Sequence, residues 1–206
     1  FQSQSVLYNI KERIIISKTE SSIVDNLGNL FSMKGFTYTL NDNLVKINNA
    51  KLLDVEKNRY HIKKAFINVK TNKLIGKDIS IDFNNKFFNK ENEPRVKGES
   101  ISSDGNISKI EGAIFTTCKK RDGCPPWELK AKEIEHNKEK KIIFYKDAWL
   151  KLYDKPVFYF PRFFHPDPTV KRQSGFLMPS FTESTNTGLS LNVPYYMVIA
   201  ENKDFT

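Results

Sequence analysis

The stretch A-F-I-N-V-K-T-N-K-L-I-G-K-D-I-S-I-D-F, residues 65–83, decides the fold class of this chain. Apolar and polar residues alternate at both of its ends, which is the period of a β-strand with one buried face. Thr71 and Asn72 stand between the two ends, where turn-forming residues let a chain reverse direction. The stretch therefore predicts two strands joined by a turn.

The same alternation recurs between Val6 and Leu152, and no segment there shows the 3.6-residue period of a long amphipathic helix. Clusters such as Leu40–Asn43 and Ser103–Asn106 contain the residues that favour turns. The other predicted strands include Ile14–Ile16, Leu44–Ile47, Ala113–Phe115, Lys141–Tyr145 and Ala148–Leu152. Many short strands at regular spacing predict an all-β fold of stacked antiparallel strands, as in a sandwich, a jellyroll or a solenoid-like stack.

Two segments share the pattern Ala-Lys-x-apolar-acid, at Ala50–Asp54 and at Ala131–Glu135. Each is followed by a turn and by a strand in which alanine precedes an aromatic residue, at Ala65 and at Ala148. The similarity indicates one supersecondary unit stacked repeatedly, unless two lysine-rich strands resemble each other by chance.

Alternate residues of a strand share a face, so the apolar members are expected to line an interior. An ordinary filled core and a groove open to a lipid give the same pattern, and the residues alone do not distinguish them. The expected lining residues are Ile67, Val69, Ile79, Ile81, Phe83, Leu150 and Leu152.

The chain is basic, with a formal net charge of +9 and 39% hydrophobic residues. A basic excess favours an anionic partner such as nucleic acid, a membrane surface or a phosphorylated lipid. Lysines spread along the chain instead of in runs also fit a second interpretation, in which they only solvate the strands. Residues 1–5 lack the features of a signal sequence, and no run of about 18 apolar residues predicts a transmembrane helix.

The two cysteines, Cys118 and Cys124, enclose the turn-forming pair Asp122–Gly123. This spacing suits a disulfide that closes a small loop, which would place the chain in an oxidising compartment. Two free thiols are the alternative. The three histidines are scattered without metal-ligand spacing, so the sequence predicts neither a metal site nor a cofactor.

The composition changes after Leu152, because residues 155–168 contain four prolines and five aromatic residues. Proline cannot donate a hydrogen bond to a β-ladder, so the segment is expected to be an extended edge or a connector, over residues 156–174. Gly175–Thr182 and Leu189–Tyr196 follow, and each is roughly as long as a membrane-crossing β-strand.

Residues 156–179, P-V-F-Y-F-P-R-F-F-H-P-D-P-T-V-K-R-Q-S-G-F-L-M-P, resemble the junction signature of the LptD (OstA/Imp) family. The similarity continues through Val193–Tyr196 and Asn202–Asp204, while residues 1–117 match only as a generic OstA-type strand repeat. Upstream, Cys124, Trp127, Ala131 and Ala148 resemble the end of the periplasmic domain of that family. The matching signature residues are Pro156, Tyr159, Pro161, Pro166, Asp167, Arg172, Ser174, Gly175, Phe176, Leu177 and Pro179.

The resemblance implies a non-enzymatic role in lipopolysaccharide transport and assembly at the outer membrane. It implies that residues 1–155 form a periplasmic OstA-like β-jellyroll, that 156–174 connect, and that 175–206 begin a truncated outer-membrane β-barrel. The implied partners are lipopolysaccharide, an LptA-type periplasmic bridge jellyroll, an LptE-type plug lipoprotein and the outer membrane itself. The jellyroll would shelter the lipid A acyl chains and pass the lipid to the barrel.

Pro179 and Pro194 lie in the two segments expected to cross the membrane. Each removes a ladder hydrogen bond, which is costly within a membrane, so the first strands could form a weak seam through which a lipid leaves. Alternatively, the prolines only bend the strands at the membrane entry.

Three other functions fit parts of the sequence. A soluble OstA-type bridge protein would bind lipid, but it has no need of the proline-aromatic segment or of strands after Gly175. An all-β carbohydrate-active enzyme would need paired carboxylates in a cleft, and no such cluster stands out. A nucleic-acid-binding β-barrel would alternate lysines with aromatic residues on one strand, whereas here the aromatic residues gather in 156–164, so no nucleic-acid partner is predicted.

Overall fold

The computed structural model describes residues 2–24, 28–84, 92–120, 125–167, 170, 174–176, 180–184, 188–200 and 202–206. The chain divides into two compact units, Phe1–His165 and Pro166–Thr206, which we describe separately. Across the described ranges the regular secondary structure is β-strand, as the sequence predicts. None of it is a helix long and apolar enough to span a membrane.

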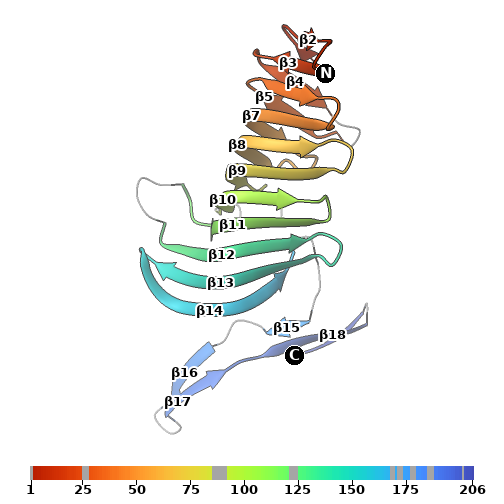
Figure 1. Ribbon diagram of the computed structural model, residues 1–206. Helices are drawn as coiled ribbons and strands as arrows, with labels where there is room; N and C mark the ends of the chain where they lie inside the picture. The colour runs from red at the N-terminus through yellow and green to blue at the C-terminus, as the bar shows by residue number, and fades with distance from the viewer. Residues whose placement is uncertain are drawn as a thin grey trace. The chain divides into compact units, whose positions relative to one another are not determined.

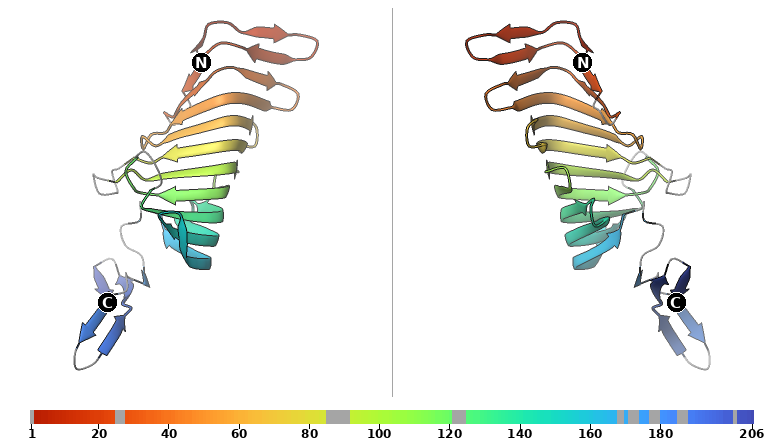
Figure 2. Two further views of the ribbon diagram at one scale, coloured as in Figure 1. Left: turned by 90° about the vertical axis from the view of Figure 1, so that its left-hand side faces the viewer. Right: turned by 90° about the vertical axis from the view of Figure 1, so that its right-hand side faces the viewer.

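The first unit contains one sheet of 14 strands, whose pairings are antiparallel wherever a register is resolved. Figures 1 and 2 show these strands stacked one above another, with the last three curved along their length. The strands are β1 (Gln2–Ser3), β2 (Leu7–Asn9), β3 (Ile14–Ser17), β4 (Ser21–Val24), β5 (Leu30–Met33), β6 (Phe36–Thr39), β7 (Leu44–Leu53), β8 (Arg59–Asn68), β9 (Lys73–Asp82), β10 (Arg95–Ser103), β11 (Ile107–Thr116), β12 (Trp127–Asn137), β13 (Ile142–Leu152) and β14 (Lys155–Pro166).

The sheet branches at β7 into two short arms. One half of β7 pairs with β6, where Leu44 lies opposite Thr39, and the other half pairs with β5, where Leu53 lies opposite Leu30. From β7 to β14 each strand pairs with the next, in the order of the sequence. The long strands therefore span both arms of the sheet.

Each long strand turns at a corner in its middle. In β8 the buried residues Ile62 and Ala65 are three positions apart, with two exposed lysines between them, and β9, β11, β12 and β13 repeat this spacing. A continuous strand would bury every second residue, so the corner adds one residue to the pattern. At this corner alternate strands carry a residue with positive φ: Asn49, Asp78, Gly112 and Asp147.

The corner corrects two predictions made from the sequence. Lys141–Tyr145 and Ala148–Leu152 were expected to be two strands, but they are the halves of β13 on either side of Asp147. The two Ala-Lys segments were expected to be structurally equivalent, but Ala131 lies opposite Ala148 whereas Ala50 lies opposite Ile62. Buried and exposed residues still alternate within each half-strand, as predicted. At the corner this alternation is displaced by one residue.

The core lies inside the bend, where small and large side chains alternate between neighbouring strands. Gly76 lies opposite Ala65 on one side and Ile101 on the other. A Cβ added at Gly76 would lie 2.7 Å from Cγ2 of Ile62, so the isoleucine occupies the space that the glycine leaves. The core near the corner is therefore interdigitated and filled.

The segment expected to be a connector from residue 156 is instead a strand up to Pro166. β14 is the last strand of the sheet, where it pairs with β13, so the other expectation, an extended edge, is the correct one for these residues. An edge strand tolerates prolines because one of its sides needs no ladder hydrogen bond. The boundary between the two units lies after His165.

The second unit contains a three-stranded sheet of β15 (Gly175–Phe176), β18 (Tyr195–Ala200) and β19 (Lys203–Phe205), and a hairpin of β16 (Ser180–Ser184) with β17 (Gly188–Asn192). The expected continuous strand Leu189–Tyr196 is divided, because Val193 and Pro194 lie between β17 and β18. Within this unit the backbone N–H of Val198 donates a 2.9 Å hydrogen bond to Oγ of Ser174.

Candidate functional site

Of the seven residues predicted to line an interior, five lie in the core or pack against it, and their contact with lipid stays a prediction. Ile79 and Ile81 are buried, and Ile67, Phe83 and Leu150 pack against the buried cluster. The other two, Val69 and Leu152, are more exposed, at 47% and 44%. Val69 follows the last residue of β8 and Leu152 is the last residue of β13, so both lie at the ends of strands.

One half of the bent sheet presents an uninterrupted apolar row to the interior, which we call the apolar wall. Its members lie opposite one another in successive strand pairs and therefore share a face. The row consists of Leu52, Tyr60, Ile81, Val96, Phe115, Leu129 and Leu150. We call the corresponding row of the other half, beginning with Val45, Ile67 and Leu74, the opposite wall.

The two walls face each other across the interior of the bent sheet. A cavity of about 30 Å³ has Leu52 and Tyr60 of the apolar wall and Ile67 and Leu74 of the opposite wall in its lining. On this measure about 10–15 Å³ is enough for one water molecule, so the cavity has room for a few water molecules at most and not for an acyl chain. An apolar ligand can therefore enter here only if the walls separate.

Hydroxyl groups join the two arms near the first strands. Ser17 in β3 and Ser21 in β4 are both buried, and Oγ of Ser21 donates to Oγ of Ser17 at 3.2 Å. Ser3 lies 3.0 Å from Ser17, and Oγ1 of Thr19 lies 3.2 Å from Oγ of Ser17. These four side chains satisfy one another's hydrogen bonds, as burial of polar groups requires.

Aromatic rings close the interior at the other end of the stack. The rings of Tyr145 and Phe163 stack with centroids 4.4 Å apart, and Phe160 lies 5.1 Å from Phe163. The hydroxyl of Tyr145 lies 2.9 Å from Nε2 of His165, and burial raises the pKa of this tyrosine well above its usual value of 10.0. Sequence reasoning missed Phe160 and Phe163 as lining residues because it assigned them to a connector.

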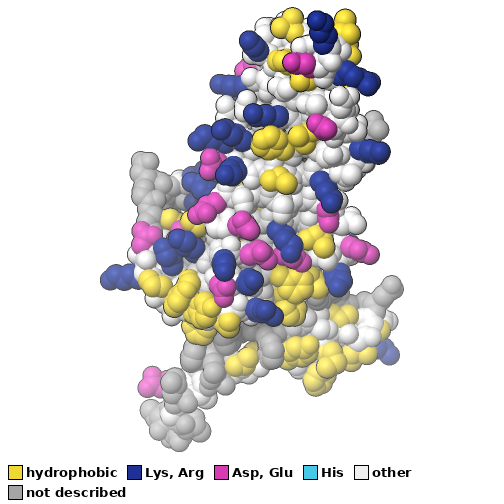
Figure 3. All heavy atoms as spheres, in the orientation of Figure 1, with side chains coloured by type: hydrophobic (Ala, Val, Ile, Leu, Met, Phe, Trp, Pro, Cys, Tyr) yellow, Lys and Arg dark blue, Asp and Glu magenta, His cyan; other side chains and the backbone are white. Residues whose placement is uncertain are grey.

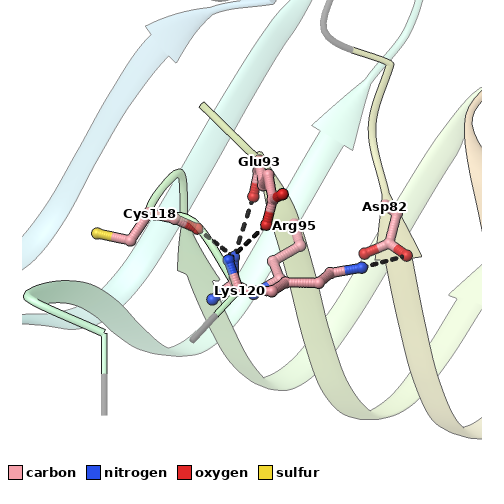
Figure 4. Close-up of polar contacts among 5 residues, drawn as sticks. All are labelled: Asp82, Glu93, Arg95, Cys118 and Lys120. Carbon is pink, nitrogen blue, oxygen red and sulfur yellow. Dashed lines mark hydrogen bonds and ion pairs between the residues drawn. The ribbon is translucent and has the colours of Figure 1, made fainter. Parts of the chain in front are cut away.

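A polar cluster fastens the chain after β11 to the ends of β9 and β10 (Figure 4). Nη1 of Arg95 donates to the carbonyl oxygens of Glu93 and Cys118, and Nζ of Lys120 lies 2.9 Å from Oδ2 of Asp82. The backbone N–H of Lys120 donates to the Glu93 carboxylate. The Cys118 sulfur points away from this cluster (Figure 4) and lies 3.7 Å from the carbonyl oxygen of Trp127.

Some predicted site residues fall outside the described ranges. Cys124 and Pro179 are among them, so the disulfide and the first seam proline stay predictions. Cys118 is described with a free thiol. Pro194 is described, and it lies between β17 and β18 instead of within a strand.

The outer surface carries both charge signs. In Figure 3 Lys and Arg side chains predominate near the N-terminal strands of the first unit and are mixed with Asp and Glu further along the stack. Nζ of Lys109 lies 2.8 Å from Oε2 of Glu135, and Nζ of Lys151 lies 3.2 Å from Oε1 of Glu128. Within the described residues no group of three His, Cys, Asp or Glu side chains could hold a metal ion. The distinctive feature of the first unit is therefore its interior.

These features define the first unit as an all-β, jellyroll-like antiparallel stack with an apolar interior between two walls. No family model matches the chain. Curated relatives do: the LPS-assembly protein LptD of Nitrosococcus oceani is 33% identical over 130 residues, which are 63% of this chain and 17% of that protein. LptD of Idiomarina loihiensis is 33% identical over 65% of this chain and 18% of that protein, and LptD of Aeromonas hydrophila is 39% identical over 47% and 12%.

Over 47–65% of its length the chain is similar to proteins of the LptD family. Its matched part spans less than a fifth of the length of these relatives. They are named as assembly proteins for lipopolysaccharide (LPS).

Proposed function

We propose that this chain takes part in LPS transport and assembly at the outer membrane, and that its first unit shelters the acyl chains of the lipid between the two walls. The observation that supports this role is the apolar wall, which runs from Leu52 in β7 to Leu150 in β13 with the ring of Tyr60 and otherwise only aliphatic side chains and Phe115. A row of this kind offers many equivalent positions along one direction. Apolar contact is non-directional, so a lipid can slide from one position to the next.

Lipid binding requires the walls to move apart, because the cavity between them at β7–β9 is only about 30 Å³. Burial of one methylene group contributes about 0.8 kcal/mol, so a chain of about twelve methylenes gains roughly 10 kcal/mol on leaving water. That gain offsets the loss of contacts between the walls. Bending at the corner lets the walls separate while the ladder hydrogen bonds within each wall remain.

The second unit and the partners complete the proposal. Strands β15–β19 would contribute to the membrane wall of the LptD barrel, with Pro179 and Pro194 weakening its pairing where a lipid leaves. The first unit would then lie in the periplasm, receive LPS from an LptA-type bridge jellyroll and deliver it to a barrel with an LptE-type plug. The family resemblance and the curated relatives support this arrangement.

Photo-crosslinking tests the sheltering role. Benzoylphenylalanine at Phe83, which packs against the core at the end of β9, should form adducts with LPS. Ile67→Asp and Leu150→Asp place a charge on the two walls and should each reduce the adduct at least tenfold. Phe66→Asp is the matched control, because Phe66 is the neighbour of Ile67 and is 39% exposed on the outer face. Full adduct yield in a folded Ile67→Asp variant would overturn the proposal, and circular dichroism reports whether the variant is folded.

A further inference from the structure

The opposite wall is not apolar along its whole length. In the pairing of β10 with β9, Ser103 lies opposite Leu74, and in the next pairing it lies opposite Ser108 of β11. Ser108 lies opposite His136 of β12, which in turn lies opposite Ile143 of β13. Directly opposite residues share a face of the sheet, so two serines and a histidine interrupt a row that is apolar at both ends.

This interruption, which we call the polar notch, consists of Ser103, Ser108 and His136. Its neighbours in the row, Leu74 and Ile143, both pack against the buried core, so the notch faces the interior and not the outer surface. All three side chains are half-buried. Oγ of Ser103 lies 2.9 Å from Oγ of Ser108, which is hydrogen-bond distance.

The notch has no counterpart on the apolar wall. The same strands, β10, β11 and β12, present Val96, Phe115 and Leu129 there. Polar groups placed among apolar ones cost free energy unless they form hydrogen bonds. Oγ of Ser103 also accepts a 3.3 Å hydrogen bond from the N–H of Gly105, and the Ser108 hydroxyl retains donor or acceptor capacity beyond its bond with Ser103. The interior is therefore amphipathic over these three strands and apolar before them, in β7 to β9.

We propose that the polar notch binds the sugar headgroup of an amphiphilic lipid whose acyl chains lie between the walls. This inference rests on the proposed function and deepens it, because it assigns an orientation to the lipid within the interior. Hydroxyl and imidazole groups exchange hydrogen bonds with the hydroxyl and amide groups of a sugar. No side chain of the notch has the fixed positive charge with which proteins usually hold a phosphate.

The notch also fixes the position of a bound lipid along the stack of strands. Acyl chains slide between equivalent apolar positions, whereas a headgroup that needs hydrogen bonds pauses at β10–β12. The wall residues before the notch, Val45, Ile67 and Leu74, then accommodate chains alone. Sequence reasoning did not find the notch, because it assigned Ser103 to a turn and treated the histidines only as candidate metal ligands.

The test compares three probes with the same twelve-carbon chain: dodecyl maltoside and dodecyl phosphate, each below its critical micelle concentration, and dodecanol below its solubility limit. The variant Ser103→Ala/Ser108→Ala/His136→Leu removes the notch in the 206-residue chain. Replacing both members of a hydrogen-bonded pair by apolar groups is nearly neutral for folding, and thermal unfolding checks this. Ser102→Ala is the matched control, since Ser102 is exposed and precedes Ser103 in β10.

We expect the variant to lose affinity for dodecyl maltoside by about tenfold, the equivalent of one to two net hydrogen bonds, and to bind dodecanol as the unmodified chain does. The control should bind all three probes normally. An equal loss for every probe, or a loss confined to dodecyl phosphate, would overturn the assignment to a sugar. If the unmodified chain binds none of the probes, the sheltering role itself fails. If it binds all three tightly and equally well, only the proposed binding of the headgroup by the notch is refuted.

Discussion

Tyr145 of β13 and Phe163 of β14 stack almost parallel, with ring centroids 4.4 Å apart and an angle of 8° between their planes. Tyr145 is 4% exposed and belongs to the core cluster, so the stack fastens the edge strand to the core. The ring centroids of Tyr159 and Trp149 lie 4.9 Å apart, and the Tyr159 hydroxyl donates a 2.9 Å hydrogen bond to Oδ1 of Asp147. A segment rich in proline is held to the sheet by its aromatic side chains.

Phe163→Ala should destabilise the first unit by about 2–3 kcal/mol, because it removes a large side chain that packs against the core and leaves a cavity. Urea unfolding followed by fluorescence measures the change. Phe164→Ala is the control, since Phe164 is 59% exposed, and it should cost well under half as much. Equal effects of the two substitutions would show that the stack does not fasten β14.

Gly76→Ala should destabilise the unit by about 1–3 kcal/mol, because the added Cβ would lie 2.7 Å from Cγ2 of Ile62. Ile62→Ala alone should also destabilise, because it opens a cavity beside Gly76. In the double variant the new methyl group occupies part of that cavity, so its cost should be smaller than the sum of the single costs. A double-mutant cycle based on thermal unfolding measures this coupling, and strict additivity would contradict the described packing.

Burial raises the pKa of Tyr60 well above the value of 10.0 that it has when unfolded, and the neighbouring Asp54 adds to the effect. The folded state therefore holds the tyrosine proton more tightly, so this contribution to stability is complete below pH 10 and falls as the pH rises further. Tyr60→Phe removes the titrating group. The unfolding free energy of the variant should therefore decrease less between pH 9 and 11 than that of the unmodified chain. Urea titrations measure the unfolding free energy at each pH. An equal decrease in the variant and the unmodified chain would refute the raised pKa of Tyr60.

Cys118 and Cys124 should form a disulfide when the chain is purified from an oxidising compartment. Intact mass after treatment with a maleimide distinguishes the two states, since the disulfide leaves no thiol to react until a reductant is added. Arg95→Ala releases the carbonyl oxygen of Cys118 and should slow reoxidation of the reduced chain. Two maleimide adducts without reductant would establish the free thiols that the sequence left as an alternative.

Pro194→Ala restores a backbone N–H between β17 and β18, where the strands are interrupted. If the interruption weakens a seam through which lipid leaves, the variant should deliver LPS to the cell surface several-fold more slowly. The measurement is a pulse-chase of labelled LPS in cells whose full-length protein carries the substitution. Ser190→Ala within β17 is the control. Unchanged delivery of LPS by the Pro194→Ala variant would mean that the proline only bends the chain and does not weaken a seam.

Much of the first unit can be predicted from residues that are close in sequence. The alternation in residues 65–69 and 79–83 identifies two strands and correctly orients Ile67, Ile79 and Ile81, because side chains of a strand alternate with a period of two. The same rule places Leu150 inside and Trp149 outside. These residues needed no knowledge of their partners.

The pairing of distant strands decided the rest. The corner shifts the phase of each strand by one residue, and a local pattern cannot reveal it because Asp78 and Asp147 adopt positive φ only where neighbouring strands bend with them. The polar notch exists because Ser103, Ser108 and His136 come from three strands whose register aligns them. The sequence by itself determined the strands and their apolar faces, since these depend on local period. Tertiary structure decided the corner, the edge position of the proline-aromatic strand and the notch, since these depend on which backbones hydrogen-bond to each other.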